Sequence, residues 1–173
     1  VLGEGRVSAF VDEQVTTPSG EVMDRQYLTH PGAVAVVAWR QDSDDIAVLR
    51  QYRHPVRMEL VEIPAGKLAE GEDPLECARR ELMEEIGRDA GEWTQLATFY
   101  TSPGFSDEIL HLYLARGLRP VEARPDEDEF LEIMHVTLAE ALSMVSRGEI
   151  EDGKTIAGLS LTALLLRGEY GSG

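Results

Sequence analysis

The segment from Asp73 to Gly87 constrains the fold of this chain most, because it carries a helix start, a helical apolar stripe and a helix stop in succession. Asp73 can cap the first turn, Pro74 suits the first helical position, and Glu76 completes a capping-box pattern. Apolar residues recur at helical spacing, at Leu75, Ala78, Leu82 and Ile86. Gly87 then favours termination. The sequence therefore predicts an amphipathic helix over residues 73–86.

Three glutamates of this helix, Glu81, Glu84 and Glu85, stand at relative positions i, i+3 and i+4. Side chains at these spacings share one helix face, where like charges repel by roughly 0.2–0.5 kcal/mol per pair. A hard divalent cation such as Mg²⁺, which prefers oxygen ligands, would favour the arrangement. A solvated acidic face is the alternative, and the three glutamates alone do not exclude it.

The neighbouring residues complete a longer pattern: Gly66, five residues, Glu72, seven residues, and then the run from Arg80 to Gly87. This pattern resembles the Nudix box, G-x5-E-x7-R-E-U-x-E-E-x-G-U, in which U is an apolar residue. Every fixed residue is present. The last apolar position holds Arg88 instead, and we expect this departure to change local packing rather than chemistry.

The resemblance implies metal-dependent hydrolysis of a diphosphate bond, with Mg²⁺ as the expected metal and Mn²⁺ as a possible substitute. It assigns metal binding to Glu81, Glu84, Glu85 and the backbone carbonyl of Ala65, and it makes Glu84 and Glu85 catalytic as well. Three further residues are expected to support the site, through a charge-assisted hydrogen bond or a tight turn: Arg80, Glu72 and Gly66.

Segments outside the box indicate the substrate. Residues 100–108 contain a Ser-Pro-Gly loop whose Pro103 follows Arg88 by fifteen positions. Together with residues 60–66 and 50–53, this loop resembles the ADP-ribose pyrophosphatase subfamily. An ordinary turn is the alternative explanation of the loop. The subfamily resemblance implies hydrolysis of ADP-ribose to AMP and ribose 5-phosphate.

The same resemblance indicates residues that contact the substrate. Arg53 and Arg50 are candidates for phosphate binding, because an arginine can bind two phosphate oxygens at once; a surface or interface ion pair is the alternative for either. Glu108 is expected to accept hydrogen bonds from ribose hydroxyls. Phe105 is expected either to border the sugar or to pack under the loop.

Arg25 and Tyr27 belong to an N-terminal segment that reads as a small sheet. In the subfamily this sheet is exchanged between subunits and contributes to the partner's site. Tyr27 is therefore a candidate for stacking on adenine, with a place in a dimer interface as the alternative, and Arg25 is a candidate for substrate binding. The resemblance implies a homodimer.

The general base is expected in the acidic run at residues 126–129. In the subfamily, a loop at this place brings one glutamate to the attacking water and a second acid to the metal. Alignment of the run makes Glu127 the expected base and Glu129 the expected metal ligand. A solvated cluster of charges is the alternative, and a shift between neighbouring acids stays open.

The succession of apolar patterns predicts an α+β fold that resembles the Nudix α/β/α sandwich with a mixed sheet. We expect helices at residues 73–86, 137–145 and 154–167. Strands are expected at residues 6–15, 21–28, 33–39, 46–52, 60–63, 93–101, 109–115 and 131–136. Residues 1–30 are expected to form a small antiparallel sheet used in dimerisation, and residues 31–173 the Nudix hydrolase domain.

Composition limits the possible partners and the location. The chain has 16 Lys and Arg against 32 Asp and Glu, a net charge of -16, so no nucleic-acid or membrane partner is expected. No apolar run reaches the ~18 residues of a membrane span, and no signal peptide is visible, which favours the cytoplasm. The single cysteine, Cys77, excludes an internal disulfide and reads as a buried, inert thiol.

Two other functions stay open on the sequence. A nucleoside diphosphate sugar hydrolase acting on GDP-mannose or a UDP-sugar would share the box. A Nudix module that binds ADP-ribose without cleaving it is the second, although such modules often lose a box carboxylate. Glu81, Glu84 and Glu85 are all present here, which favours an enzyme.

Overall fold

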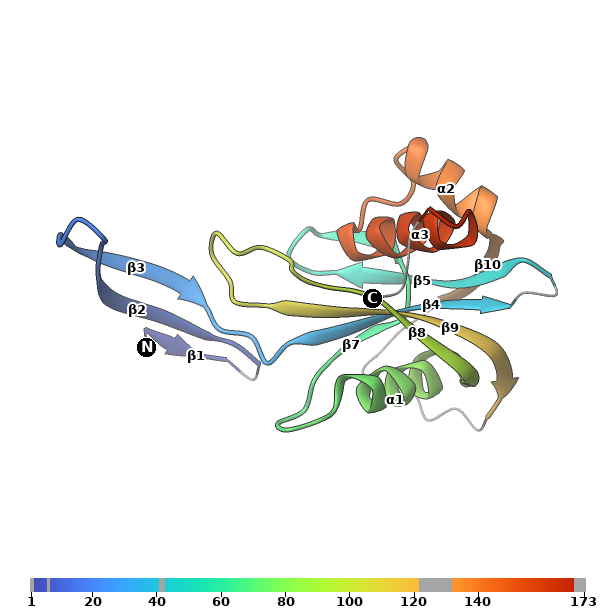
Figure 1. Cartoon of the computed structure of the whole chain (residues 1–173), viewed down its shortest axis with the longest axis horizontal. Coiled ribbons are helices and arrows are strands. Elements are labelled where there is room, and N and C mark those ends of the chain that lie inside the picture. The colour runs from blue at the N-terminus through green and yellow to red at the C-terminus, as the bar shows by residue number, and fades with distance from the viewer. Residues whose placement is uncertain (1, 6, 41–42, 122–131, 170–173) are drawn as a thin grey trace.

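The computed structural model describes residues 2–5, 7–40, 43–121 and 132–169 of the 173-residue chain. Within these residues the chain forms a small antiparallel sheet and a larger mixed sheet with helices on both faces (Figure 1). The α+β class and the helix–sheet–helix layers agree with the sequence prediction. Among the described residues, no helix combines the length and the apolar character that a membrane crossing requires.

The larger sheet is built around β4, Ala33–Arg40, whose first seven residues are all buried. β4 pairs in parallel with β9, Ile109–Pro120, and antiparallel with β5, Asp45–Arg53. The flanking strands β10, Glu132–Thr137, and β8, Arg88–Tyr100, complete the order β10-β5-β4-β9-β8. A strand covered on both faces needs apolar side chains on both, which explains the unbroken apolar run of β4.

Two short strands attach to this path and lead the chain to the first residues of the box. β6, Met58–Glu62, pairs with β5, and β7, Ala65–Lys67, pairs with β4. The sequence does not predict β7, because three residues are too few to display a strand alternation. Its pairing nevertheless fixes Ala65 and Gly66 against the central strand.

The helices cover opposite faces of the sheet (Figure 1). α1, Pro74–Ile86, packs Cys77, Ala78 and Leu82 against one face. α2, Leu138–Ser146, and α3, Gly153–Leu166, pack on the other face, where the larger apolar cluster lies. Burial raises the pKa of the Cys77 thiol to about 12, in keeping with the inert thiol expected from the sequence.

The ends of α1 follow the predicted signals. The Asp73 carboxylate accepts hydrogen bonds from the backbone N–H groups of Leu75 and Glu76, at 2.9 and 3.2 Å. Gly87 ends the helix in the left-handed region, with φ 61° and ψ 38°. The next strand, β8, begins directly at Arg88 rather than at residue 93, because residues 88–92 pair with β9 although their sequence lacks apolar alternation.

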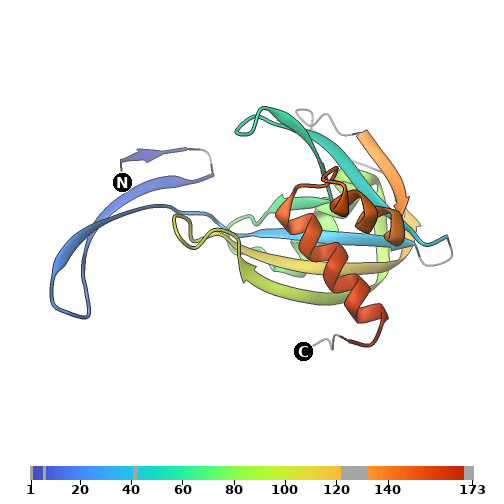
Figure 2. The ribbon, with the colours of Figure 1, turned by 90° about the horizontal axis from the view of Figure 1, so that it is seen from above.

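The small sheet has the order β1-β2-β3 and projects away from the helices and the larger sheet (Figures 1 and 2). Its strands are β1, Gly3–Glu4, β2, Ala9–Thr16, and β3, Val22–Leu28, and none of their residues is buried. Backbone hydrogen bonds join Leu28 to the loop before β9: Leu28 N–H to the Phe105 carbonyl at 2.8 Å, and Asp107 N–H to the Leu28 carbonyl at 3.2 Å.

Candidate active site

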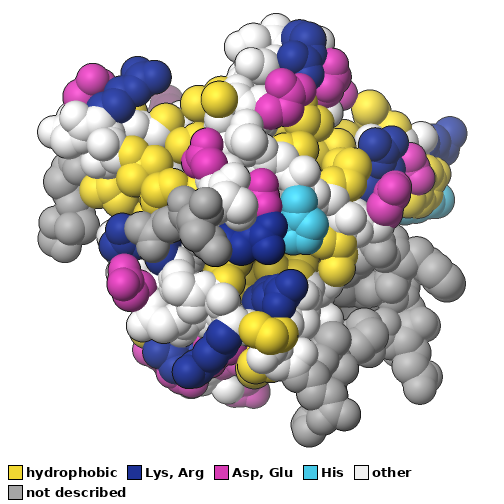
Figure 3. Space-filling model, turned by 90° about the vertical axis from the view of Figure 1, so that its right-hand side faces the viewer, with side chains coloured by type: hydrophobic (Ala, Val, Ile, Leu, Met, Phe, Trp, Pro, Cys, Tyr) yellow, Lys and Arg dark blue, Asp and Glu magenta, His cyan; other side chains and the backbone are white. Residues whose placement is uncertain are grey.

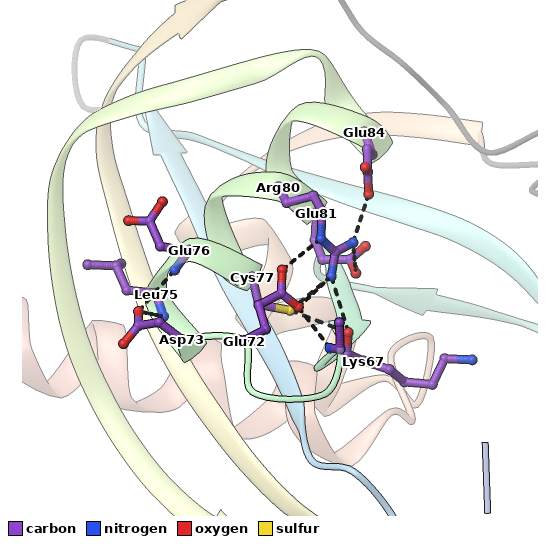
Figure 4. A network of polar contacts seen from close by, with 10 residues as sticks. Lys67, Glu72, Asp73, Leu75, Glu76, Cys77, Arg80, Glu81 and Glu84 are labelled. Atoms are coloured by element: carbon purple, nitrogen blue, oxygen red, sulfur yellow. Dashed lines mark hydrogen bonds and ion pairs between the residues drawn. The ribbon is translucent and has the colours of Figure 1, made fainter.

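The guanidinium of Arg80 organises the exposed side of α1 (Figure 4). It donates from Nε and Nη2 to the two carboxylate oxygens of Glu72, at 2.9 and 3.0 Å. Its Nη1 donates to Glu81 at 2.7 Å and to Glu84 at 2.9 Å. The hydrogen bonds from Arg80, together with one from the Ala69 backbone, lower the pKa of Glu72 to about 2. Glu72 and Glu81 in turn raise the pKa of Arg80. Arg80 therefore ties the loop before α1 to two glutamates of the helix.

Glu85 points to the other side of the box, toward the sheet. Its side chain is buried, and its Oε2 accepts a hydrogen bond from the backbone N–H of Ala65 at 2.9 Å. The helix glutamate and the first residue of β7 are thus held together, although 20 residues separate them in sequence. This contact places Ala65 beside the glutamate face, as the assignment of both to one site requires.

Gly66 is needed because the Glu81 carboxylate comes very close to its backbone. A Cβ atom at position 66 would overlap the carboxylate carbon and both carboxylate oxygens of Glu81. The first glycine of the box therefore leaves room for a side chain of the box helix. The sequence pattern contains both residues but does not reveal that they touch.

The donor set fits a hard divalent cation. Glu81, Glu84 and Glu85 offer carboxylate oxygens, the ligand type that Mg²⁺ prefers. Within the part of the chain that the structure describes, no three acidic, histidine or cysteine side chains are already gathered around one point. The Arg80 cation instead bridges Glu81 and Glu84. A positive charge is thus already favoured at the position between these two carboxylates.

A second network of charged side chains comes from strands β5 and β6 and from α3. The buried carboxylate of Glu62 accepts hydrogen bonds from Arg53 Nε and Nη2, at 2.7 and 2.6 Å, and pairs with the ammonium of Lys154. Lys154 also pairs with Asp152 at 3.0 Å. Burial opposes ionisation of Glu62, but the two cations outweigh it and hold its pKa below the ordinary value.

Lys154 and Asp152 are site residues that the sequence reasoning missed. Ninety-two positions separate Glu62 from Lys154, and no spacing rule connects them. The N-cap role of Asp152 for α3 is readable from the sequence, yet it says nothing of which strand the helix end meets.

One cavity of about 760 Å³ is lined both by the Arg80–Glu81 pair of α1 and by Arg53 and Lys154, the two cations bound to Glu62. The residues that line it include Arg53, Gly66, Arg80, Glu81, Glu108 and Lys154. Arg50 does not line it, because its side chain pairs with Glu132 at 3.4 Å and Glu59 at 3.9 Å on the other face of β5. The structure thus brings Arg53 and Glu108 to the box helix and leaves Arg50 outside.

A separate cavity of about 430 Å³ lies where the small sheet meets the Ser-Pro-Gly loop. Arg25 and Tyr27 line it from β3, and Tyr100, Pro103 and Phe105 line it from the end of β8 and the loop. Three aromatic rings and a guanidinium around one hollow are suited to a flat, hydrogen-bonding ring system. The predicted Arg25, Tyr27 and Phe105 therefore lie together.

The two remaining predicted site residues, Glu127 and Glu129, lie outside the described residues.

Comparison with known proteins agrees with this geometry. The family described as the NUDIX domain matches residues 29–159. The chain is 47% identical over 153 residues to the ADP-ribose pyrophosphatase of Bacillus subtilis (strain 168), covering 87% of this chain and 82% of that one. It is 46% identical over 154 residues to the methanol dehydrogenase activator of Bacillus methanolicus, covering 88% and 83%. A solved structure described as an ADP compounds hydrolase superposes with a TM-score of 0.83 at 21% identity, covering 96% of this chain and 90% of that one.

Proposed function

This chain belongs to the Nudix family, and we propose that it hydrolyses the diphosphate bond of ADP-ribose with Mg²⁺ as the metal. One observation carries the proposal: Glu81 and Arg80 of α1 and the Glu62-bound guanidinium of Arg53 line the same cavity. A diphosphate held there meets anionic metal ligands on one side and a cation on the other. The name of the 47% identical relative supports the choice of ADP-ribose.

Glu81, Glu84 and Glu85 would hold the metal, with the carbonyl of Ala65 as a further ligand. Bound Mg²⁺ neutralises the diphosphate and polarises the attacking water. Arg80 holds the carboxylates of Glu81 and Glu84 on one side of the helix. Glu85 holds Ala65 in place by accepting a hydrogen bond from the backbone N–H of Ala65. The water oxygen would bond to a phosphorus as the proposed base, Glu127, takes its proton; the phosphoanhydride bond would break, and AMP and ribose 5-phosphate would leave.

Arg53 is positioned to bind a phosphate. Glu62 accepts from its Nε and Nη2, and within the described residues its Nη1 has no hydrogen-bond partner. The Nη1 group of a guanidinium that is fixed in this way can donate to a phosphate oxygen without first giving up another contact. Lys154 also forms an ion pair with Glu62. The single negative charge of Glu62 therefore does not neutralise both cations, and the remaining positive charge attracts the anionic substrate.

The cavity at the small sheet is the proposed adenine site. Tyr27 and Phe105 would stack on the base, and Arg25 would donate to it or to the sugar. Glu108 lines the cavity of about 760 Å³ described above, which we call the diphosphate cavity. Its carboxylate lies 3.5 Å from His30 and would accept hydrogen bonds from a ribose hydroxyl. Glu127 as the base and Glu129 as a metal ligand stay part of the proposal on the family resemblance.

The small sheet also supports the proposal of a homodimer. Residues Val11, Val15, Met23 and Tyr27 lie on one face of the β2–β3 pair, and all are half-buried rather than buried. A small sheet with no covered face is marginal in water, so a second copy would stabilise it. We propose that residues 1–30 form this dimerisation element, and that the enzyme acts in the cytoplasm.

A substrate panel tests the function directly. The protein is incubated with Mg²⁺ and ADP-ribose, ADP-glucose, GDP-mannose, UDP-glucose or NADH, and the products are separated. The expected result is preferred cleavage of ADP-ribose to AMP and ribose 5-phosphate. A preference for GDP-mannose or a UDP-sugar would move the chain to the nucleotide-sugar hydrolases. Tight binding of ADP-ribose without cleavage would make it a binding module.

A further inference from the structure

Arg88, the residue that departs from the box pattern, lines a cavity of about 420 Å³ that shares no lining residue with the diphosphate cavity. We call it the Arg88 pocket. Its polar side chains are Arg40, Asp45, Arg88 and His135, and its apolar residues are Ala38, Ala47, Ile86, Leu118, Pro120 and Ile133. They come from strands β4, β5, β8, β9 and β10 and from the last residue of α1.

Strand pairing explains why these side chains meet. Arg88 stands opposite Pro120, and His135 stands opposite Ala47, so each pair shares one face of the sheet. Ala38 and Ala47 are also opposite each other, and their small side chains leave the hollow between the strands and the end of α1. The space-filling view of this end of the molecule shows Lys or Arg side chains beside a histidine, with hydrophobic side chains around them (Figure 3).

The described side chains that line the pocket carry a net positive charge, although the chain as a whole is acidic. Arg40 is paired with Asp45, and this pairing lowers the pKa of the Asp45 carboxyl. Arg88 is half-buried, and its side chain makes no ion pair or hydrogen bond with any part of the chain that the structure describes. An unpaired guanidinium that has lost part of its water is costly, and an anionic ligand would offset that cost.

The apolar floor limits which anions fit. Ala38, Ala47 and Ile86 cannot hydrogen-bond a bare ion, but they can pack against carbon atoms of a ligand. The volume of about 420 Å³ lies within the range of small-molecule pockets, roughly 300–1,000 Å³. His135, which lines the same pocket as Arg88, offers a ring N–H as a second donor.

We propose that the Arg88 pocket binds a small organic anion, whose phosphate or carboxylate group contacts Arg88 and His135 and whose apolar body rests on the alanine and isoleucine floor. The site is separate from the diphosphate cavity and does not depend on the proposed reaction. It also gives the arginine in the box a role that an apolar residue could not fill.

Calorimetric titration of the full chain in EDTA tests the proposal, because metal removal prevents turnover of any nucleotide. The probes are phenyl phosphate, benzoate, AMP and inorganic phosphate. Phenyl phosphate or benzoate is expected to bind, and the stronger of the two identifies the preferred anionic group. Inorganic phosphate is expected to bind more weakly, because it leaves the apolar floor uncovered.

Four variants locate the binding. Arg88→Ile restores an apolar residue in the box and is expected to weaken binding about tenfold or more, the effect of losing a hydrogen bond to a charged group. Arg88→Lys should retain part of the affinity. Arg119→Ile removes a neighbouring arginine of β9 that pairs with Asp89 and does not line the pocket, and it should leave binding unchanged. Arg53→Gln, in the diphosphate cavity, should also leave it unchanged.

Thermal unfolding and ¹H–¹⁵N spectra of each variant check that the fold is retained and that the shifts caused by the probe map to the Arg88 pocket. The proposal is overturned if no probe binds at millimolar concentration. It is equally overturned if Arg53→Gln abolishes binding while Arg88→Ile does not, or if inorganic phosphate binds as tightly as phenyl phosphate.

Discussion

Arg53 donates from Nε and Nη2 to the two carboxylate oxygens of Glu62, at 2.7 and 2.6 Å, and so has a fixed orientation at the edge of the diphosphate cavity. Arg50, three residues earlier on the same strand, pairs with Glu59 and Glu132 outside that cavity. The two arginines therefore form a matched pair for mutagenesis.

Arg53→Lys is expected to raise KM for ADP-ribose about tenfold, because lysine cannot bind Glu62 and a phosphate through one planar fork. The change in kcat should be smaller. Arg50→Lys is the control and should leave KM unchanged. Steady-state kinetics measures both, and equal effects of the two substitutions would contradict the assignment of Arg53 to the substrate.

Gly66→Ala is expected to lower kcat strongly with little loss of stability. The added Cβ collides with the Glu81 carboxylate, which is the far end of a flexible side chain and can rotate away, but a displaced Glu81 no longer serves the metal site. Gly3→Ala is the control, since a Cβ there meets nothing within 4 Å. Urea unfolding and turnover are compared; a large loss of stability with full specific activity would contradict the explanation.

Glu85→Gln is expected to reduce kcat by about 100-fold or more, by analogy with the loss of one group that stabilises transition-state charge. The fold should persist, because the amide oxygen can still accept the Ala65 N–H bond. Mg²⁺ should raise the Tm of the wild type more than that of the variant, because a ligand that binds the folded state more tightly stabilises it more. Glu76→Gln, at an exposed glutamate elsewhere on α1, is the control. Near-normal turnover of Glu85→Gln would refute the metal-helix assignment.

The free energy of unfolding should fall at acid pH because Glu72 becomes protonated. Its pKa falls from an ordinary 4.5 to about 2 because it accepts hydrogen bonds from Arg80 and from Ala69 N–H. A folded-state pKa below the unfolded value means that this stabilisation is complete above pH 4.5 and is lost as the pH falls toward 2. In Glu72→Gln, the free energy of unfolding should therefore decline less across this interval than in the wild type. Glu70→Gln, in the same loop, should follow the wild-type profile in urea titrations at each pH.

Val15→Lys is expected to convert a dimer into a monomer, because it puts a charge on the face of the small sheet that carries Val11, Met23 and Tyr27. Gln14→Lys places the same charge on the opposite face and should leave the dimer intact. Light scattering after size-exclusion chromatography gives the masses. A wild-type monomer, or a Val15→Lys dimer, would argue against this interface.

The sequence alone determined the features that depend on neighbouring residues. The start of α1 at Asp73 and its end at Gly87 follow from local hydrogen bonding and backbone freedom, and the central position of β4 follows from its unbroken apolar run. The shared face of Glu81 and Glu84 follows from helix periodicity. The opposite orientations of Arg50 and Arg53 also follow from the strand alternation, since an odd spacing reverses the face, but the sequence prediction named both as candidates for phosphate binding.

Only the tertiary structure decided which distant residues meet. Strand order and helix packing bring Lys154 to Glu62, place Tyr27 and Phe105 around one cavity, and place Arg88 and His135 around another. The physical reason is that local backbone preferences act over a few residues, whereas these contacts depend on how whole strands align and which sheet face each helix covers. The box thus located the glutamate-bearing helix in the sequence, and the fold supplied the opposite wall of the cavity and the surroundings of Arg88.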